Sequence, residues 1–119
     1  MKFSGIVKKG SDRGKSLGFP TANIEAPKDL ENGLYVGLAS AKPALIFVGA
    51  NETFGETLRQ AEIYLLDFSG DLYHQEIEVE TFRKIREVVK FASAEELVTQ
   101  MKDDERIARE FFTEYNKNN

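Results

Sequence analysis

The chain contains no cysteine, no tryptophan and a single histidine, His74. Without cysteine, disulfides, thiolate catalysis and cysteine-based zinc or iron–sulfur sites are excluded. With one histidine, we expect neither a Ser–His–Asp mechanism nor a multi-histidine metal site, and we interpret His74 as an exposed turn residue. No apolar run approaches the roughly 18–20 residues of a membrane span, and Met1 is not followed by a signal-peptide pattern. We therefore expect a cytoplasmic protein that does not enter a membrane.

Length and charge set further limits. The 119 residues, 41% hydrophobic and 30% charged, are typical of one globular domain. The net charge is −4, although residues 1–28 carry six Lys/Arg against Asp12 and Glu25. A second basic cluster surrounds Glu87 and consists of Arg83, Lys84, Arg86 and Lys90. A mostly acidic chain is not expected to bind a nucleic-acid backbone broadly. The two basic segments fit either one small anionic ligand or solvated strand ends.

Alternating and apolar runs predict short β-strands through most of the chain. They cover Phe3–Lys8, Leu34–Ser40, Ala44–Val48, Ala61–Phe68 and Glu76–Phe82. We interpret Ala41-Lys42-Pro43 as a hairpin turn and residues 69–71 as a second turn. Five or six antiparallel strands with glycine-rich connections predict a mainly β fold, a small barrel over about residues 1–92.

The last quarter of the chain predicts helix. Ser93 and Glu96 form a capping box, in which the Ser93 hydroxyl accepts the Glu96 backbone N–H and the Glu96 side chain reaches back. Apolar residues then follow near helical spacing: Leu97, Met101, Ala108, Phe111, Phe112 and Tyr115. We expect a helical segment over about residues 93–115 that packs on the barrel. Asp103-Asp104 is the point where it could divide in two, and residues 116–119 should fray.

The glycine-rich segment 10–18 is the first candidate for ligand binding. Several glycines let backbone N–H groups converge on an anion, and Arg13 and Lys15 add positive charge. The segment is not a P-loop, because three residues instead of four separate Gly10 from Gly14 and Pro20 opposes a following helix. It predicts either a phosphate-binding loop or a flexible surface loop.

Three polar side chains are the next candidates. Pro20 fixes the backbone before an extended Thr-x-Asn run, which places the side chains of Thr21 and Asn23 on the same side. They could hold Mg²⁺, a phosphate oxygen or a sugar hydroxyl, or they could stabilise a turn. Glu62 lies in an apolar strand and shares a face with Tyr64. It is a candidate general base if that face lines the barrel mouth, and an ordinary strand glutamate if the face meets water.

The segment Arg13–Asn23, with the sequence RGKSLGFPTAN, resembles the signature of the riboflavin kinase family. The resemblance continues in order through residues 33–35, 49–54, 62–68, 71–73 and 85–97, and so covers nearly the whole chain. The Pro-Thr-Ala-Asn run followed by the strand glutamate at position 62 is its most specific part. The chain departs from the family pattern at Glu52, His74 and Ala92.

The resemblance implies a six-stranded antiparallel Greek-key barrel with a C-terminal α-helix. It implies a loop over the ATP phosphates, with nucleotide contacts from Gly10, Ser11, Arg13, Gly14, Lys15, Gly18 and Thr21. Thr21 and Asn23 would hold Mg²⁺ at the phosphoryl group, and Glu62 would act as the catalytic base for the ribityl 5′-hydroxyl. A second flap over residues 86–93 would cover the isoalloxazine ring, with flavin contacts from Phe19, Arg86 and Phe91.

The function that follows is transfer of the ATP γ-phosphoryl group to the 5′-hydroxyl of riboflavin, giving FMN and ADP. The alternative is a barrel that binds flavin or nucleotide without catalysis. We expect a single domain over residues 1–119 and a monomer whose partners are riboflavin/FMN and ATP/ADP, not nucleic acid or membrane. Because it contains one glycine-rich phosphate loop and no second nucleotide-binding module, we expect the chain to stop at FMN and not to make FAD.

Overall fold

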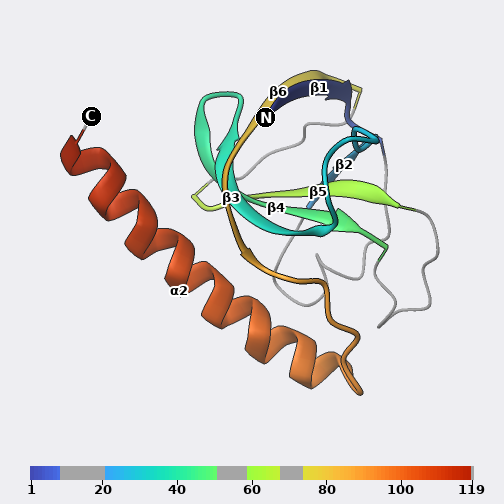
Figure 1. Cartoon of the computed structure of the whole chain (residues 1–119), viewed down its shortest axis with the longest axis vertical. Helices are drawn as coiled ribbons and strands as arrows, with labels where there is room; N and C mark the ends of the chain where they lie inside the picture. The colour runs from blue at the N-terminus through green and yellow to red at the C-terminus, as the bar shows by residue number, and fades with distance from the viewer. Residues whose placement is uncertain (9–20, 51–58, 68–73, 119) are drawn as a thin grey trace.

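The computed structural model describes residues 1–8, 21–50, 59–67 and 74–118, which form six strands and one helix (Figure 1). The elements are β1 (Lys2–Ile6), β2 (Ala22–Ile24), β3 (Gly33–Ala39), β4 (Lys42–Gly49), β5 (Gln60–Leu65), β6 (Glu76–Arg86) and α2 (Ala94–Asn118). All neighbouring strands are antiparallel, in the order β1-β6-β3-β4-β5-β2. The predicted six-stranded antiparallel barrel with a C-terminal helix is confirmed.

The two edge strands, β1 and β2, approach each other and nearly close the barrel. Just beyond β1, the backbone N–H of Lys8 donates to the carbonyl oxygen of Asn23 at 2.7 Å, in a β-bridge between these residues. Gly5 permits the approach, because a Cβ there would lie only 3.2 Å from the Cβ of Ile24. Among the described residues, no helix is long and apolar enough to cross a membrane.

Inward-pointing side chains form one apolar core inside the barrel. On β5, Ala61, Ile63 and Leu65 point inward and are buried. They pack against alternate residues of the other strands, among them Ile24, Tyr35, Ala44, Ile46, Val48 and Val79. Because these inner side chains pack against one another, the described part of the barrel interior is a hydrophobic core.

The outward-pointing side chains of β3 and β4 are apolar as well, and α2 covers them. The second cluster between barrel and helix contains Leu34, Val36, Leu45, Leu66, Ala108 and Phe112. Aromatic rings extend it along the helix, with the ring centroids of Phe82 and Tyr115 5.3 Å apart. Figure 1 shows the helix running diagonally past the barrel on this side. The predicted packing of the aromatic end of the helix on the barrel is confirmed.

The helix begins at the predicted capping box. The Glu96 backbone N–H donates to Ser93 Oγ at 3.2 Å. The Glu96 side chain accepts the backbone N–H of Ala92 at 3.0 Å, one residue before the expected partner. The first turn of α2 is therefore capped by its own sequence.

The predicted division of the helix at Asp103-Asp104 is wrong. α2 continues through both residues to Asn118, beyond the expected end at residue 115 and into the segment expected to fray. Asp103 pairs with Arg106 one helical turn away, at 2.8 Å. Asp104 pairs with Arg86, at the end of β6, at 2.7 Å. Both carboxylates thus find partners without leaving the helical conformation.

Three local expectations are corrected and one is confirmed. The β3–β4 turn consists of Ser40 and Ala41, with φ angles of 49° and 64°, so that the expected turn residues Lys42 and Pro43 lie in β4. β6 extends past Phe82 to Arg86, and the three-residue strand β2 was not predicted as a strand. His74 is an exposed turn residue with a φ of 67°, as expected.

Candidate active site

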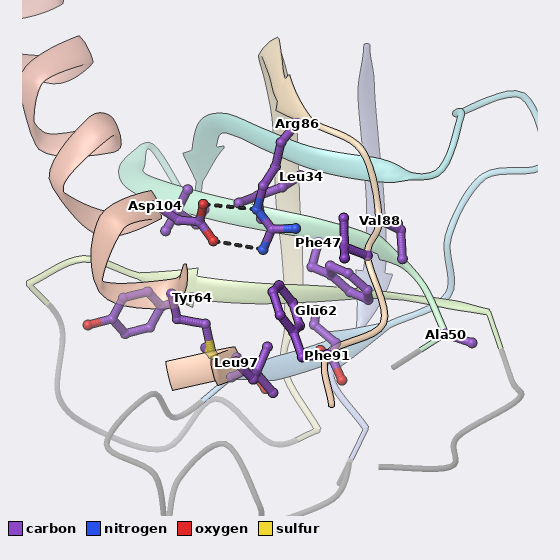
Figure 2. Close-up of a pocket in the computed structure, with 14 residues that line it drawn as sticks. Leu34, Phe47, Ala50, Glu62, Tyr64, Arg86, Val88, Phe91, Leu97 and Asp104 are labelled. Atoms are coloured by element: carbon purple, nitrogen blue, oxygen red, sulfur yellow. Dashed lines mark hydrogen bonds and ion pairs between the residues drawn. The ribbon is translucent and has the colours of Figure 1, made fainter. Parts of the chain in front are cut away.

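A cavity lies between the outer face of the barrel and α2 (Figure 2). Three parts of the chain form its walls: the outer faces of β3, β4 and β5, the segment that follows β6, and the N-terminal half of α2. Its lining residues are Thr21, Leu34, Leu45, Phe47, Ala50, Glu62, Tyr64, Arg86, Val88, Val89, Phe91, Leu97, Met101 and Asp104. Most of these side chains are apolar, and the few polar groups are therefore the ones that could orient a ligand.

Glu62 is the carboxylate that β5 supplies to this cavity. Strand alternation places it with Tyr64 on the outer face, because Ala61 and Ile63 point into the core. Glu62 is half-buried. The sequence left two settings for Glu62, the barrel mouth and open water. The structure shows a third one, a pocket between sheet and helix.

Thr21 and Asn23 lie beside this glutamate. The register of β2 and β5 pairs Asn23 directly with Glu62, so that the two side chains are cross-strand neighbours on the outer face. Asn23 is 3% exposed. Thr21, two residues earlier and on the same side of the chain, lines the cavity. The structure thus brings the three polar candidates together: Thr21 and Glu62 line the cavity, and Asn23 lies beside Glu62 without lining it.

The side chains of Thr21, Asn23 and Glu62 fit a divalent metal ion that binds together with a phosphate-bearing ligand. A hydroxyl, a carboxamide oxygen and a carboxylate are hard oxygen donors of the kind that Mg²⁺ prefers. In the part of the chain that the structure describes, no group of three or more His, Cys, Asp or Glu side chains could hold a metal ion. Thr21 and Asn23 therefore suit a metal whose remaining ligands are water and phosphate oxygens.

Arg86 and Phe91, predicted to contact a flavin, both line the cavity. Arg86 ends β6, and its guanidinium forms a two-bond ion pair with Asp104 of α2, drawn as dashed lines in Figure 2. The guanidinium carbon also lies 5.9 Å from the centroid of the Phe91 ring. Arg86 is therefore fixed by the helix on one side of the cavity and contacts the segment after β6 on the other.

Two further members of the basic cluster around Glu87, Lys84 and Arg83, also contact the protein itself. Lys84 Nζ lies 2.7 Å from Glu87 Oε1 and 3.6 Å from Glu31 Oε2, and the hydrogen bond to Glu87 is the main cause of a raised Lys84 pKa. Arg83 lies over the ring of Phe111, 4.8 Å from its centroid. These charges serve contacts within the protein, which favours the interpretation as strand-end charges over an open anion site.

Tyr64 is a neutral group at the other end of the cavity. Burial raises the pKa of its phenol, and the nearby Glu105 carboxylate raises it further. The hydroxyl therefore stays protonated at neutral pH. Figure 2 shows it pointing away from Glu62, which leaves Glu62 as the candidate base of this wall.

Part of the predicted site lies outside the described residues. This holds for Phe19 and for the predicted phosphate-loop residues Gly10, Ser11, Arg13, Gly14, Lys15 and Gly18. Their roles stay predictions.

The sequence reasoning missed the apolar walls and Asp104. Leu34, Phe47, Leu97 and Met101 were recognised only as strand or helix residues, and Asp104 was interpreted as a helix break. A signal for Asp104 was present, because it falls at helical spacing with Leu97, Met101 and Ala108 on the apolar face of α2. A carboxylate on such a face requires a partner when the helix is packed.

Comparison with known proteins places the chain in a family. The family described as "Flavokinase: Riboflavin kinase" matches residues 1–112. A bifunctional riboflavin kinase/FMN adenylyltransferase of Escherichia coli K12 is 38% identical over 117 residues, which cover 92% of this chain and 37% of that protein. The RNA-binding riboflavin kinase RibR of Bacillus subtilis is 40% identical over 108 residues, 86% of this chain and 47% of that protein.

A solved structure shares the fold. The crystal structure of riboflavin kinase from Trypanosoma brucei superposes with a TM-score of 0.67 at 25% identity, covering 94% of this chain and 79% of that one. The chain spans less than half the length of the two bacterial relatives. The family match covers almost all of the described structure, and the chain belongs to the riboflavin kinase family.

Proposed function

We propose that this chain transfers the γ-phosphoryl group of ATP to the 5′-hydroxyl of riboflavin and forms FMN and ADP. One observation carries the proposal: Glu62 stands between an apolar cavity and the neighbouring oxygen donors Thr21 and Asn23. The cavity suits an aromatic ring system, the oxygen donors suit a metal-bound phosphate, and the carboxylate between them suits a hydroxyl proton.

Glu62 acts as the general base. Phosphoryl transfer depends mainly on positioning and on charge stabilisation, and a carboxylate suffices to accept the proton of the attacking hydroxyl. Because Glu62 sits on the rigid strand β5 with Asn23 opposite in register, its position is set by the barrel. A base of this kind contributes on the order of 10²–10⁴-fold to the rate.

Thr21 and Asn23 hold Mg²⁺ and the phosphate oxygens at the same end of the cavity. When bound, the metal neutralises the charge of the phosphate oxygens. Asn23 lies in β2 opposite Glu62, and Thr21, directly before β2 and two residues from Asn23, lines the cavity with Glu62. Residues 10–18, outside the described part, remain the predicted cover of the ATP phosphates.

The apolar walls receive the isoalloxazine ring. Phe47 from β4 and Phe91 from the segment after β6 offer aromatic surface, and Leu97 of α2 completes this part of the wall. The cavity volume is about 70 Å³, whereas pockets for ligands of this size usually enclose about 300–1,000 Å³. The cavity therefore has to widen when riboflavin enters, and the segment 87–92, which has no strand or helix structure, is the predicted flap.

The test is chromatography of riboflavin after incubation with the purified chain and Mg-ATP. We expect FMN and an equal amount of ADP. Quenching of flavin fluorescence separates the alternatives, because a non-catalytic module would bind riboflavin with Mg-ADP and still form no FMN from Mg-ATP. Absence of both binding and turnover contradicts the proposal.

A second incubation tests where the chain stops. Supplied with FMN, excess ATP and Mg²⁺, the 119-residue chain should form no FAD and release no pyrophosphate. FAD formed together with pyrophosphate would show that the same site also transfers adenylyl groups. The single-domain organisation, the monomeric state, the cytoplasmic location and the lack of a nucleic-acid partner stay predictions from the sequence.

A further inference from the structure

Asp104 occupies an unusual place on α2. It lies on the face that packs against the barrel, in line with Leu97 and Ala108, and it is only 2% exposed. It also lines the cavity. Removing a carboxylate from water is costly unless charge and hydrogen bonds compensate it. The contacts of Asp104 therefore show which groups compensate the burial of its carboxylate.

Three hydrogen bonds hold this carboxylate. Arg86 Nε donates to Oδ1 at 2.9 Å, and Arg86 Nη2 donates to Oδ2 at 2.7 Å. Gln100 Nε2, one helical turn before Asp104, donates to Oδ1 at 2.9 Å. Both carboxylate oxygens of Asp104 are thus engaged by side chains of the protein itself, and this geometry directs Asp104 toward Arg86.

The same guanidinium also fixes the segment that follows β6. Arg86 Nη1 donates to the carbonyl oxygen of Glu87 at 3.1 Å, and its carbon lies 5.9 Å from the Phe91 ring centroid. Residues 87–92 have no helical or strand structure of their own. Arg86 is thus a link with Asp104 on one side and the cavity wall from Glu87 to Phe91 on the other (Figure 2).

We propose that Asp104 is a positioning residue for riboflavin: it locks Arg86, and Arg86, through the Glu87 carbonyl and the Phe91 ring, holds in place the segment that lines the cavity next to the flavin ring. This inference rests on the proposed function. Asp104 touches neither the phosphoryl group nor Glu62 in this scheme. Its loss should therefore weaken flavin binding more than it slows the chemical step.

The first measurement separates KM from kcat. In Asp104→Asn, which keeps the shape and loses the charge, we expect the KM for riboflavin to rise about tenfold, the loss of 1.4 kcal/mol in binding. The KM for ATP and the kcat should change by less than about threefold. Asp104→Glu should restore part of the affinity. Asp103→Asn, a change at the exposed neighbouring carboxylate that pairs within the helix, is the matched control and should leave all constants unchanged.

A paired replacement distinguishes positioning from a purely structural role. Exchanging both partners of a buried ion pair for apolar residues of similar size often preserves the fold. In Arg86→Met/Asp104→Leu we expect a melting temperature near the wild type together with a raised riboflavin KM. A folded double variant with an unchanged riboflavin KM overturns the inference.

Gln100→Ala decides the matter if the double variant does not fold. It removes one of the three hydrogen bonds and leaves both charges in place, so that the fold is retained. A measurable rise in riboflavin KM supports the positioning role, and an unchanged KM overturns it. Failure of the wild-type chain to form FMN would instead contradict the proposed function.

Discussion

The inner and outer faces of the same strands carry different tasks in this barrel. On β5, Ala61, Ile63 and Leu65 point inward and belong to the core. The alternate residues Glu62 and Tyr64 point outward and line the cavity. The two sets of residues alternate along one strand. Core residues and cavity residues therefore differ in the direction in which their side chains point, and not in the part of the sequence from which they come.

The outer face becomes a site only because other segments cover it. α2 packs over part of β3 and β4 through Ala108 and Phe112. Further toward its N-terminus, the segment 87–92 and Leu97 stand away from the sheet and enclose the cavity. The difference between the two faces is thus that the inner face is filled by side chains of its own strands, whereas the outer face is covered by the helix and an irregular segment that enclose a cavity.

The strongest test of this difference is Glu62→Gln. The change keeps the shape of the side chain and removes the base, so that FMN formation should fall by at least about 10²-fold. Because Glu62 lies outside the core, far-ultraviolet circular dichroism and the melting temperature should change little. The rate is measured by chromatography of FMN under saturating riboflavin and Mg-ATP.

Glu78→Gln is the control for that experiment. Glu78 is also a strand glutamate on an outer face, but it is exposed and lies on β6 away from the cavity. It should retain wild-type turnover. If Glu62→Gln also retained it, Glu62 would be an ordinary strand residue and the proposed mechanism would be wrong.

The next effect in size concerns Thr21→Ala and Asn23→Ala. Both should lower kcat/KM by about 10²-fold, the usual loss when one group that stabilises transition-state charge is removed. Riboflavin binding without nucleotide should be affected less, because these groups serve the phosphates. Thr99→Ala, which removes an exposed helix hydroxyl bonded to Glu95, is the control. Full activity of both site variants would favour the turn-stabilising interpretation.

A smaller effect is expected when one methyl group is removed from a side chain on the inner face of the barrel, because this changes stability and not activity. Ile63, 2% exposed, packs inside the barrel between the two site residues of β5. Ile63→Val should lower the free energy of unfolding by about 1 kcal/mol and leave the KM for riboflavin unchanged. Phe47→Leu, on the cavity face of β4, should change the free energy of unfolding little and raise the KM for riboflavin several-fold. Equal effects of both variants on KM would show that the two faces are coupled.

Much of this arrangement was predictable from local patterns. The strict alternation from Glu76 to Phe82 predicted β6, and the Ser93–Glu96 capping box predicted the start of α2. Local patterns singled out Thr21, Asn23 and Glu62 as candidates, and the family resemblance supplied the roles expected of them. The short strand β2 was not predicted, because three residues carry no periodic pattern. Their strand structure comes from pairing with β5.

The location of the pocket was not predictable, because it depends on contacts between distant segments. Alternation shows that Glu62 and Tyr64 share a face, but only the packing of α2 determines what covers that face. Asp104 illustrates the same limit. Its partner Arg86 is 18 residues earlier, and a sequence with two adjacent aspartates favours a helix break until that partner is known.

The smallest expected effect comes from the solvent side of the same helix. Arg106 pairs with Asp103 and Glu110, one turn before and one turn after it, and all three side chains are at least half exposed. Water screens such pairs and the long side chains lose freedom in forming them, so each contributes little. Arg106→Gln should therefore shift the melting temperature by less than about 4 °C and leave FMN formation unchanged.

Arg86→Gln is the comparison variant, with the same change of residue type beside the cavity. It leaves the buried Asp104 without its charge partner and should lower the melting temperature clearly more. Equal shifts for the two variants would mean that burial beside the cavity does not change what an ion pair with this helix contributes to stability.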